Sequence, residues 1–132
     1  MSEARLRVPN DVNAPEYARR QLSEMLSTVD PELSIDVLLI VSEAVTNAVL
    51  PHHREPVPDA VIEVDLRLEP GVINGEIRDG RLGFDVELPA FDEHVARRLY
   101  LIDRLASRWG LEFTDGARLW FEVRADRESP DA

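Results

Sequence analysis

The chain of 132 residues contains no cysteine and no lysine. The absence of cysteine excludes disulfides, thiolate metal sites and cysteine nucleophiles. Apart from histidine, every cationic side chain is arginine, so no lysine can form a Schiff base or serve as a P-loop phosphate ligand. No stretch approaches the roughly 20 apolar residues that a membrane-spanning helix needs, and residues 1–8 lack the apolar core of a signal peptide. The sequence therefore predicts a cytoplasmic protein.

The chain also has no excess of positive charge, since its formal net charge is -11. Nucleic-acid binding depends on basic side chains that neutralise phosphates, so this charge argues against DNA or RNA as the main ligand. It favours a basic protein partner, because opposite fields steer the encounter. The length suits one domain. We expect residues 1–124 to form that domain and the polar residues 125–132 to form a frayed tail.

Periodicity and helix-start residues predict the elements of the first half. A short strand at residues 5–8 precedes a helix at 13–28, in which Asn13 and Glu16 have the spacing of a capping box. A second helix begins at Asp30-Pro31 and runs to residue 50. It is apolar on nearly every side, which predicts deep burial against a sheet.

Alternation of apolar and charged residues marks a strand at 62–68, and Pro70-Gly71 turns the chain into a hairpin partner at 72–78. Further elements are expected as a helix at 95–106 and a closing hairpin of 111–113 and 119–123. This order predicts an α+β fold, a two-layer sandwich whose mainly antiparallel sheet carries helices on one face.

Three polar side chains stand out against apolar surroundings. Glu43 and Asn47 lie four residues apart, so they project from one stripe of the buried helix roughly 6 Å apart. One interpretation is hydrogen bonding to backbone or at a subunit interface, since buried polar groups need partners. The other is a Mg²⁺ site of amide, water and phosphate oxygens, with Glu43 near a reacting hydroxyl. Asp79 ends the apolar face of its strand, where it either caps the following turn or serves a ligand.

A resemblance extends these local patterns. Residues 42–49 (SEAVTNAV) are similar to the N-box of bacterial anti-sigma-factor serine kinases, and residues 77–84 (IRDGRLGF) are similar to their D-x-G-x-G-F box. Residues 99–110 resemble the helix after the second glycine box, and 119–123 resemble the closing strand. The chain thus resembles the anti-sigma factor and serine-protein kinase family of the GHKL superfamily, which has the Bergerat, or histidine-kinase-like ATPase, fold.

The resemblance implies roles for four residues. Asn47 would help to hold Mg²⁺, and Glu43 would act as or orient a general base. Asp79 would accept a hydrogen bond from the adenine amino group. Gly83 would let the backbone approach the nucleotide closely.

Departures from the family pattern concern the glycine boxes. Arg81 replaces the first glycine of the D-x-G-x-G box, and Ala96, Arg97 and Arg98 stand where the second box reads G-x-G. Arg118 replaces a threonine that supports the adenine pocket. Such residues add bulk and restrict φ, although Arg97 and Arg98 could pair with phosphate. The departures predict weak or lost binding of ATP and Mg²⁺ and favour a pseudokinase.

The function implied is that of an anti-sigma-factor-like regulator, a homodimer that binds a sigma factor, a STAS-type anti-sigma antagonist, or both. The alternative is an active ATP-dependent serine/threonine kinase that phosphorylates its antagonist. A third hypothesis, a dimerisation domain without a ligand, leaves Glu43 and Asn47 with no purpose beyond packing. Neither nucleic acid nor a membrane is an expected partner.

Overall fold

A computed structural model describes residues 2–9, 11–49, 61–79, 93–112 and 117–125, without the side chains of 47–49, 93–98 and 117. The secondary structure within these ranges comprises five strands and three helices. In chain order they are β1 (Ser2–Pro9), α1 (Ala14–Met25), α2 (Pro31–Val49), β2 (Val61–Glu69), β3 (Val72–Asp79), α3 (Glu93–Leu105), β4 (Arg108–Glu112) and β5 (Ala117–Arg124).

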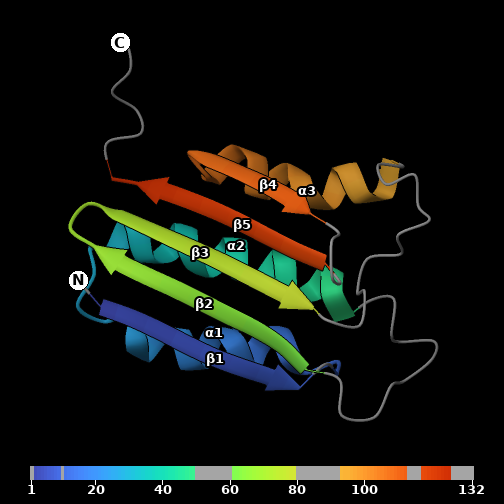
Figure 1. The fold of residues 1–132 in the computed structure, drawn as a ribbon, viewed down its shortest axis with the longest axis horizontal. Helices are drawn as coiled ribbons and strands as arrows, with labels where there is room; N and C mark the ends of the chain where they lie inside the picture. Colours follow the sequence, from blue (N-terminus) through green and yellow to red (C-terminus); the bar gives the residue numbers. More distant parts are fainter. Residues whose placement is uncertain (1, 10, 50–60, 80–92, 113–116, 126–132) are drawn as a thin grey trace.

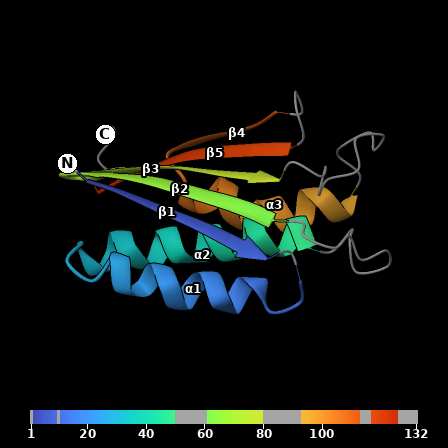
Figure 2. The same cartoon turned by 60° about the horizontal axis from the view of Figure 1, so that its bottom comes forward.

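The strands form one sheet in the order β1-β2-β3-β5-β4, and every neighbouring pair is antiparallel. The helices all lie on one side of this sheet (Figures 1 and 2). The predicted α+β sandwich with helices on one face is therefore confirmed. We call the side that carries the helices the helical face and the opposite side the open face.

Alternation along the strands decides which residues enter the core. Ile62, Val64 and Leu66 of β2 are buried on the helical face, whereas Glu63 and Asp65 point to the open face. The predicted turn between β2 and β3 is confirmed, since the hairpin register closes across Glu69 and Val72. Gly71 in this turn has φ 77°, a conformation that glycine adopts without steric cost.

Apolar side chains of the helices and of the helical face form one core. The largest fully buried side chains come from both layers and include Phe121, Leu22, Leu26, Ile40, Ile62, Leu66, Ile73 and Ile102. The expectation that α2 is buried on nearly every side is wrong for one stripe. Ile35 and Leu39, which lie four residues apart on one stripe of the helix, are 56% and 41% exposed. A helix packed on one layer buries only part of its circumference.

The two helix starts differ from each other. Pro31 opens α2 as predicted, and the Asp30 carboxylate accepts a hydrogen bond from the Glu32 amide at 2.9 Å. The capping box predicted for α1 is wrong, since Asn13 makes no side-chain cap and has helical dihedral angles. Asp11 instead accepts a bond from the Asn13 amide at 2.9 Å and so turns the chain before the helix begins.

The second strand of the predicted closing hairpin, at 119–123, lies within β5, whereas its first strand begins earlier than predicted. Its first strand was expected at residues 111–113, but β4 spans Arg108–Glu112, and the connection at 113–116 lies outside the described residues. The predicted tail at 125–132 is likewise outside this range beyond Ala125. Among the described helices, none is long and apolar enough to cross a membrane.

Candidate functional site

The segments that carry the predicted site residues meet at one end of the sandwich. The C-terminal end of α2, the end of β3 and the start of α3 all lie there (Figures 1 and 2). Helix α2 packs against β3 and against α3, which fixes this arrangement. Residues distant in sequence, Glu43 and Asp79 among them, are thereby carried by neighbouring elements.

Asp79 is the best-defined member of the site. It is the last residue of β3, 2% exposed, and it follows Ile73 and Ile77 on the helical face. Its register partners are Ile62 on β2 and Ala117 on β5, so strands flank it on both sides. A carboxylate in such a place is expensive to bury, which makes it a candidate for binding rather than for packing.

Glu43 lies on α2 and is half-buried, between the fully buried Val41 and Ala44. The adjoining Ser42 hydroxyl accepts a hydrogen bond from Nη1 of Arg19 at 2.7 Å. Thr46 donates its hydroxyl proton to the Ser42 carbonyl at 2.8 Å. Both bonds fix the turn of α2 that precedes Asn47.

Arg19 is a residue that the sequence analysis missed. It projects from α1 towards Ser42, a contact across 23 residues of sequence. No local motif signals such a contact, because it depends on the antiparallel packing of α1 and α2. This hydrogen bond links α1 to the turn of α2 that begins at Ser42.

Arg118 does not belong to this site. It was expected to replace a threonine that supports the adenine pocket, yet its side chain lies on the open face, where Nε donates to Glu76 at 2.8 Å and Nη1 to Glu112 at 3.0 Å. The hydrogen bond to Glu76 raises the pKa of the Arg118 guanidinium, and the charges of Glu76 and Glu112 act in the same direction. The expectation that Arg118 crowds the nucleotide side is therefore wrong. By strand register, Ala117 is the residue that lies beside Asp79.

Other predicted members fall outside the described part of the structure. Gly83 and Arg81 are not among the described residues. Asn47, Arg97 and Arg98 lie on described helices, but their side chains are not described. The roles expected for them, including the Mg²⁺ site at Asn47, remain predictions.

Two comparisons with known proteins identify the family of this chain. A family model described as a histidine kinase-like ATPase domain matches residues 8–126. The anti-sigma F factor of Priestia megaterium is 31% identical over 113 residues, which cover 83% of this chain and 73% of that protein. The matched regions include α2, β3 and α3, the elements that build the site.

Proposed function

Because the chain belongs to the histidine kinase-like ATPase domain family, in its anti-sigma-factor branch, we propose that it binds a sigma factor, a STAS-type anti-sigma antagonist, or both. The observation that carries the proposal is the similarity to an anti-sigma F factor, together with the placement of the candidate site residues in this fold. The fold places Glu43 on α2, which packs against β3, and Asp79 at the buried end of β3. A cytoplasmic homodimer is part of the same proposal.

Binding of ATP by this regulator is proposed to be weak or lost. Arg81, Ala96 and Arg98 replace glycines whose backbone approaches phosphate in the family, and a side chain at such positions narrows the accessible φ range. The orientation of Arg118 removes one obstacle and leaves these three. The fold would then be retained chiefly for its protein-binding surface.

Calorimetric titration with purified candidate partners tests the regulatory proposal. We expect a sigma factor or a STAS-domain protein of the source organism to bind at micromolar concentration or below. Size-exclusion chromatography of the mixture gives the stoichiometry and the state of the free protein. Absence of binding to every sigma factor and STAS protein of that organism would contradict the proposal.

Titration with Mg-ATP and Mg-ADP tests the nucleotide pocket separately. We expect no binding tighter than the upper micromolar range, and loss of any residual binding in Asp79→Asn. Asp103→Asn is a matched control, because its amide oxygen can still accept the 2.9 Å hydrogen bond from Nε1 of Trp109. Low-micromolar binding that only Asp79→Asn removes would contradict weak or lost ATP binding.

The second candidate function is an active serine/threonine kinase, which the orientation of Arg118 away from Asp79 favours. In that case Glu43 would accept the proton of the attacking hydroxyl, and Asn47 would hold Mg²⁺, which supplies charge stabilisation to the phosphates when bound. The test is transfer of radiolabelled phosphate from ATP to a serine of the antagonist, abolished by Asn47→Ala. No transfer to a substrate that a related kinase does phosphorylate would rule this function out.

A further inference from the structure

The charge of the molecule is unevenly distributed between the open face and the rest. The open face of the described strands carries seven arginines and seven acidic residues, whereas the whole chain has 15 basic and 26 acidic residues. The members are Arg5, Arg7, Arg67, Arg78, Arg108, Arg118 and Arg124 with Glu3, Glu63, Asp65, Glu69, Glu76, Glu112 and Glu122. The formal charge of -11 therefore resides on the remainder of the chain. An acidic partner meets less repulsion at the open face than elsewhere.

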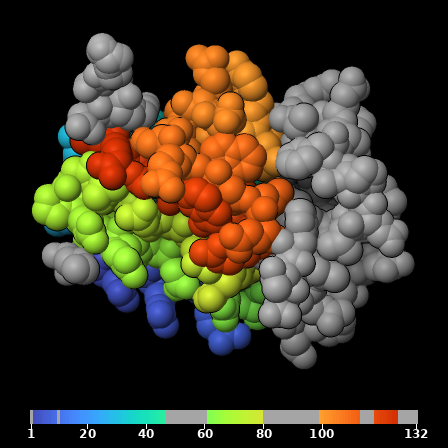
Figure 3. Space-filling view, turned by 45° about the horizontal axis from the view of Figure 1, so that its top comes forward, coloured from blue at the N-terminus to red at the C-terminus, as the bar shows by residue number. Residues whose placement is uncertain are grey.

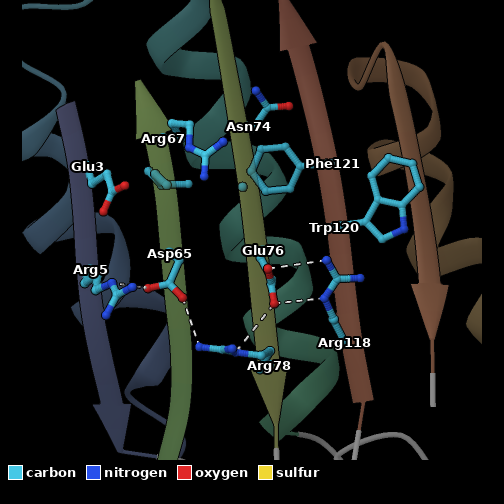
Figure 4. Close-up of a pocket in the computed structure, with 12 residues that line it drawn as sticks. Glu3, Arg5, Asp65, Arg67, Asn74, Glu76, Arg78, Arg118, Trp120 and Phe121 are labelled. Carbon is cyan, nitrogen blue, oxygen red and sulfur yellow. Dashed lines mark hydrogen bonds and ion pairs between the residues drawn. The ribbon is translucent and has the colours of Figure 1, made fainter. Parts of the chain in front are cut away.

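The strands β2, β3, β5 and β4 adjoin one another on this face (Figure 3), and residues of β1, β2, β3 and β5 line a depression in it. We call the depression the hollow; its volume is about 510 Å³. Its rim includes Arg67 and Asn74 on one side and Trp120 on the other (Figure 4). Four arginines and three carboxylates line it, which gives an excess of one positive charge in an acidic protein.

A ladder of ion pairs holds most of these arginines in place. Asp65 pairs with Arg5 at 3.4 Å and with Arg78 at 3.0 Å. Glu76 pairs with Arg78 at 3.6 Å and with Arg118 at 2.8 Å. These arginines are therefore committed to carboxylates of the sheet (Figure 4).

Arg67 differs from them. Within the part of the chain that the structure describes, it forms no ion pair, although it borders the hollow and is exposed. Glu3 is its register neighbour on β1, and the two side chains do not pair. Arg67 thus has its guanidinium available for an incoming carboxylate, which it can bind in a bidentate manner.

Trp120 supplies a preorganised apolar surface at the opposite rim. Its indole lies across Gly110 of β4, where an added Cβ would come within 2.5 Å of Nε1. The guanidinium of Arg108 stacks on the ring at 5.8 Å from its centroid. Tryptophan and arginine are the residue types that dominate binding energy at protein interfaces, and a ring already held in place loses little entropy on binding.

We propose that the hollow on the open face is a second docking site, on the side of the sheet opposite the candidate nucleotide site, and that it binds an acidic segment of a partner protein. A carboxylate of the segment pairs with Arg67, and an adjacent apolar side chain packs on Trp120. The occupant is acidic, which distinguishes it from the basic partner that the net charge favours elsewhere. The proposal goes beyond the proposed regulatory function and does not depend on nucleotide.

Nuclear magnetic resonance of the ¹⁵N-labelled protein tests this proposal. The probe is a soluble synthetic peptide rich in glutamate and leucine, and the comparison peptide has arginine in place of glutamate. The indole N–H of Trp120 reports on the hollow. That of Trp109 is an internal control, because it donates to Asp103 of α3 on the other side of the sheet. We expect the acidic peptide alone to shift the Trp120 signal saturably while the Trp109 signal stays in place.

Matched variants separate the hollow from general electrostatics. Arg67→Glu is expected to weaken peptide binding by about tenfold or more, because a bidentate pair is replaced by repulsion. Arg67→Gln is expected to have a smaller effect in the same direction. Arg7→Glu makes the same charge change at an open-face arginine that also forms no ion pair among the described residues. Arg7 lies outside the hollow, so affinity should stay within about twofold.

Three results would overturn the proposal. One is a Trp120 signal that the acidic peptide does not move, or that both peptides move equally. Another is equal loss of affinity in Arg67→Glu and Arg7→Glu, which would reduce the effect to net charge. The third is a Trp120 shift that depends on protein concentration without peptide, which would make a second copy of the chain the occupant.

Discussion

The two faces of the sheet are built from alternate residues of the same strands, yet they are stabilised by different forces. On β5, Phe121 points into the core and is 1% exposed, while its neighbour Trp120 lies half-buried on the open face. The helical face is filled by apolar side chains of the helices, whereas the open face is covered by ion pairs. The stability of the helical face therefore depends on the volume of its side chains. The strength of the ion pairs on the open face depends on exposure to solvent and on salt.

This difference determines whether a substitution affects mainly the stability of the protein or mainly its binding properties. A side chain in the core has no room to move, so its substitution is expressed as lost stability. A side chain on the open face can relax into solvent, so its substitution is expressed mainly in what the surface binds. Pairs of neighbouring or equivalent residues on the two faces allow a direct test.

The largest contrast is expected between Phe121→Ala and Trp120→Ala. The first leaves a cavity beside Gly75 and Leu66 and should lower the free energy of unfolding by about 3–5 kcal/mol. The second removes a half-buried ring and should cost only about 1 kcal/mol. Urea unfolding of both variants measures the two losses. Equal losses would show that the open face is as tightly packed as the core.

The next largest difference in stability is expected between substitutions of two glycines, Gly75 beside Phe121 and Gly110 beside Trp120. An added Cβ at Gly75 would lie 2.2 Å from Cζ of Phe121 and 2.8 Å from Cδ2 of Leu66, both enclosed in the core. Gly75→Ala should therefore cost about 1–3 kcal/mol through overpacking. An added Cβ at Gly110 would displace the ring of Trp120, which is half-buried and not enclosed in the core, so stability should fall by less than about 1 kcal/mol. Thermal unfolding gives the ranking, and a displaced Trp120 indole signal in Gly110→Ala would identify the displacement of the ring. A reversed ranking would contradict the comparison.

The smallest effect is expected for the ion pairs of the open face. Arg118→Ala removes two pairs, to Glu76 and Glu112, at a cost of about 0.2–1 kcal/mol for each. Arg7→Ala, which breaks no ion pair in the described part of the chain, is the control and should be close to neutral. Urea unfolding at low and high salt should show the difference shrinking as salt screens the charges. A loss that is unchanged at high salt would point to packing by the arginine stem.

The sequence predicted the elements well where the signal was local. The alternation at 62–68, the Pro70-Gly71 turn and the start of α2 at Asp30-Pro31 are all confirmed. Each depends on backbone preferences that a few adjacent residues decide. The cap at Asn13 was mispredicted because a neighbouring carboxylate, Asp11, forms the competing local hydrogen bond.

The candidate site was predicted only in part. Asp79 was located correctly at the end of the apolar face of its strand, because strand periodicity alone places it there. Its burial and its closeness to the end of α2 depend on helices packing across the sheet. Arg19 was missed for the same reason, since its partner Ser42 belongs to another helix.

The sequence by itself determined most helices and strands, because the spacing of apolar residues is a local property. It also determined the family to which the chain belongs, because the family motifs occur in order along the chain. The tertiary structure decided which side of the sheet each alternate residue faces. It turned Arg118 away from Asp79 and towards Glu76, and it left Arg67 beside the hollow without an ion pair in the described residues. The physical reason is that a strand offers two equivalent faces, and only the apolar surface of the packed helices selects the one that is buried.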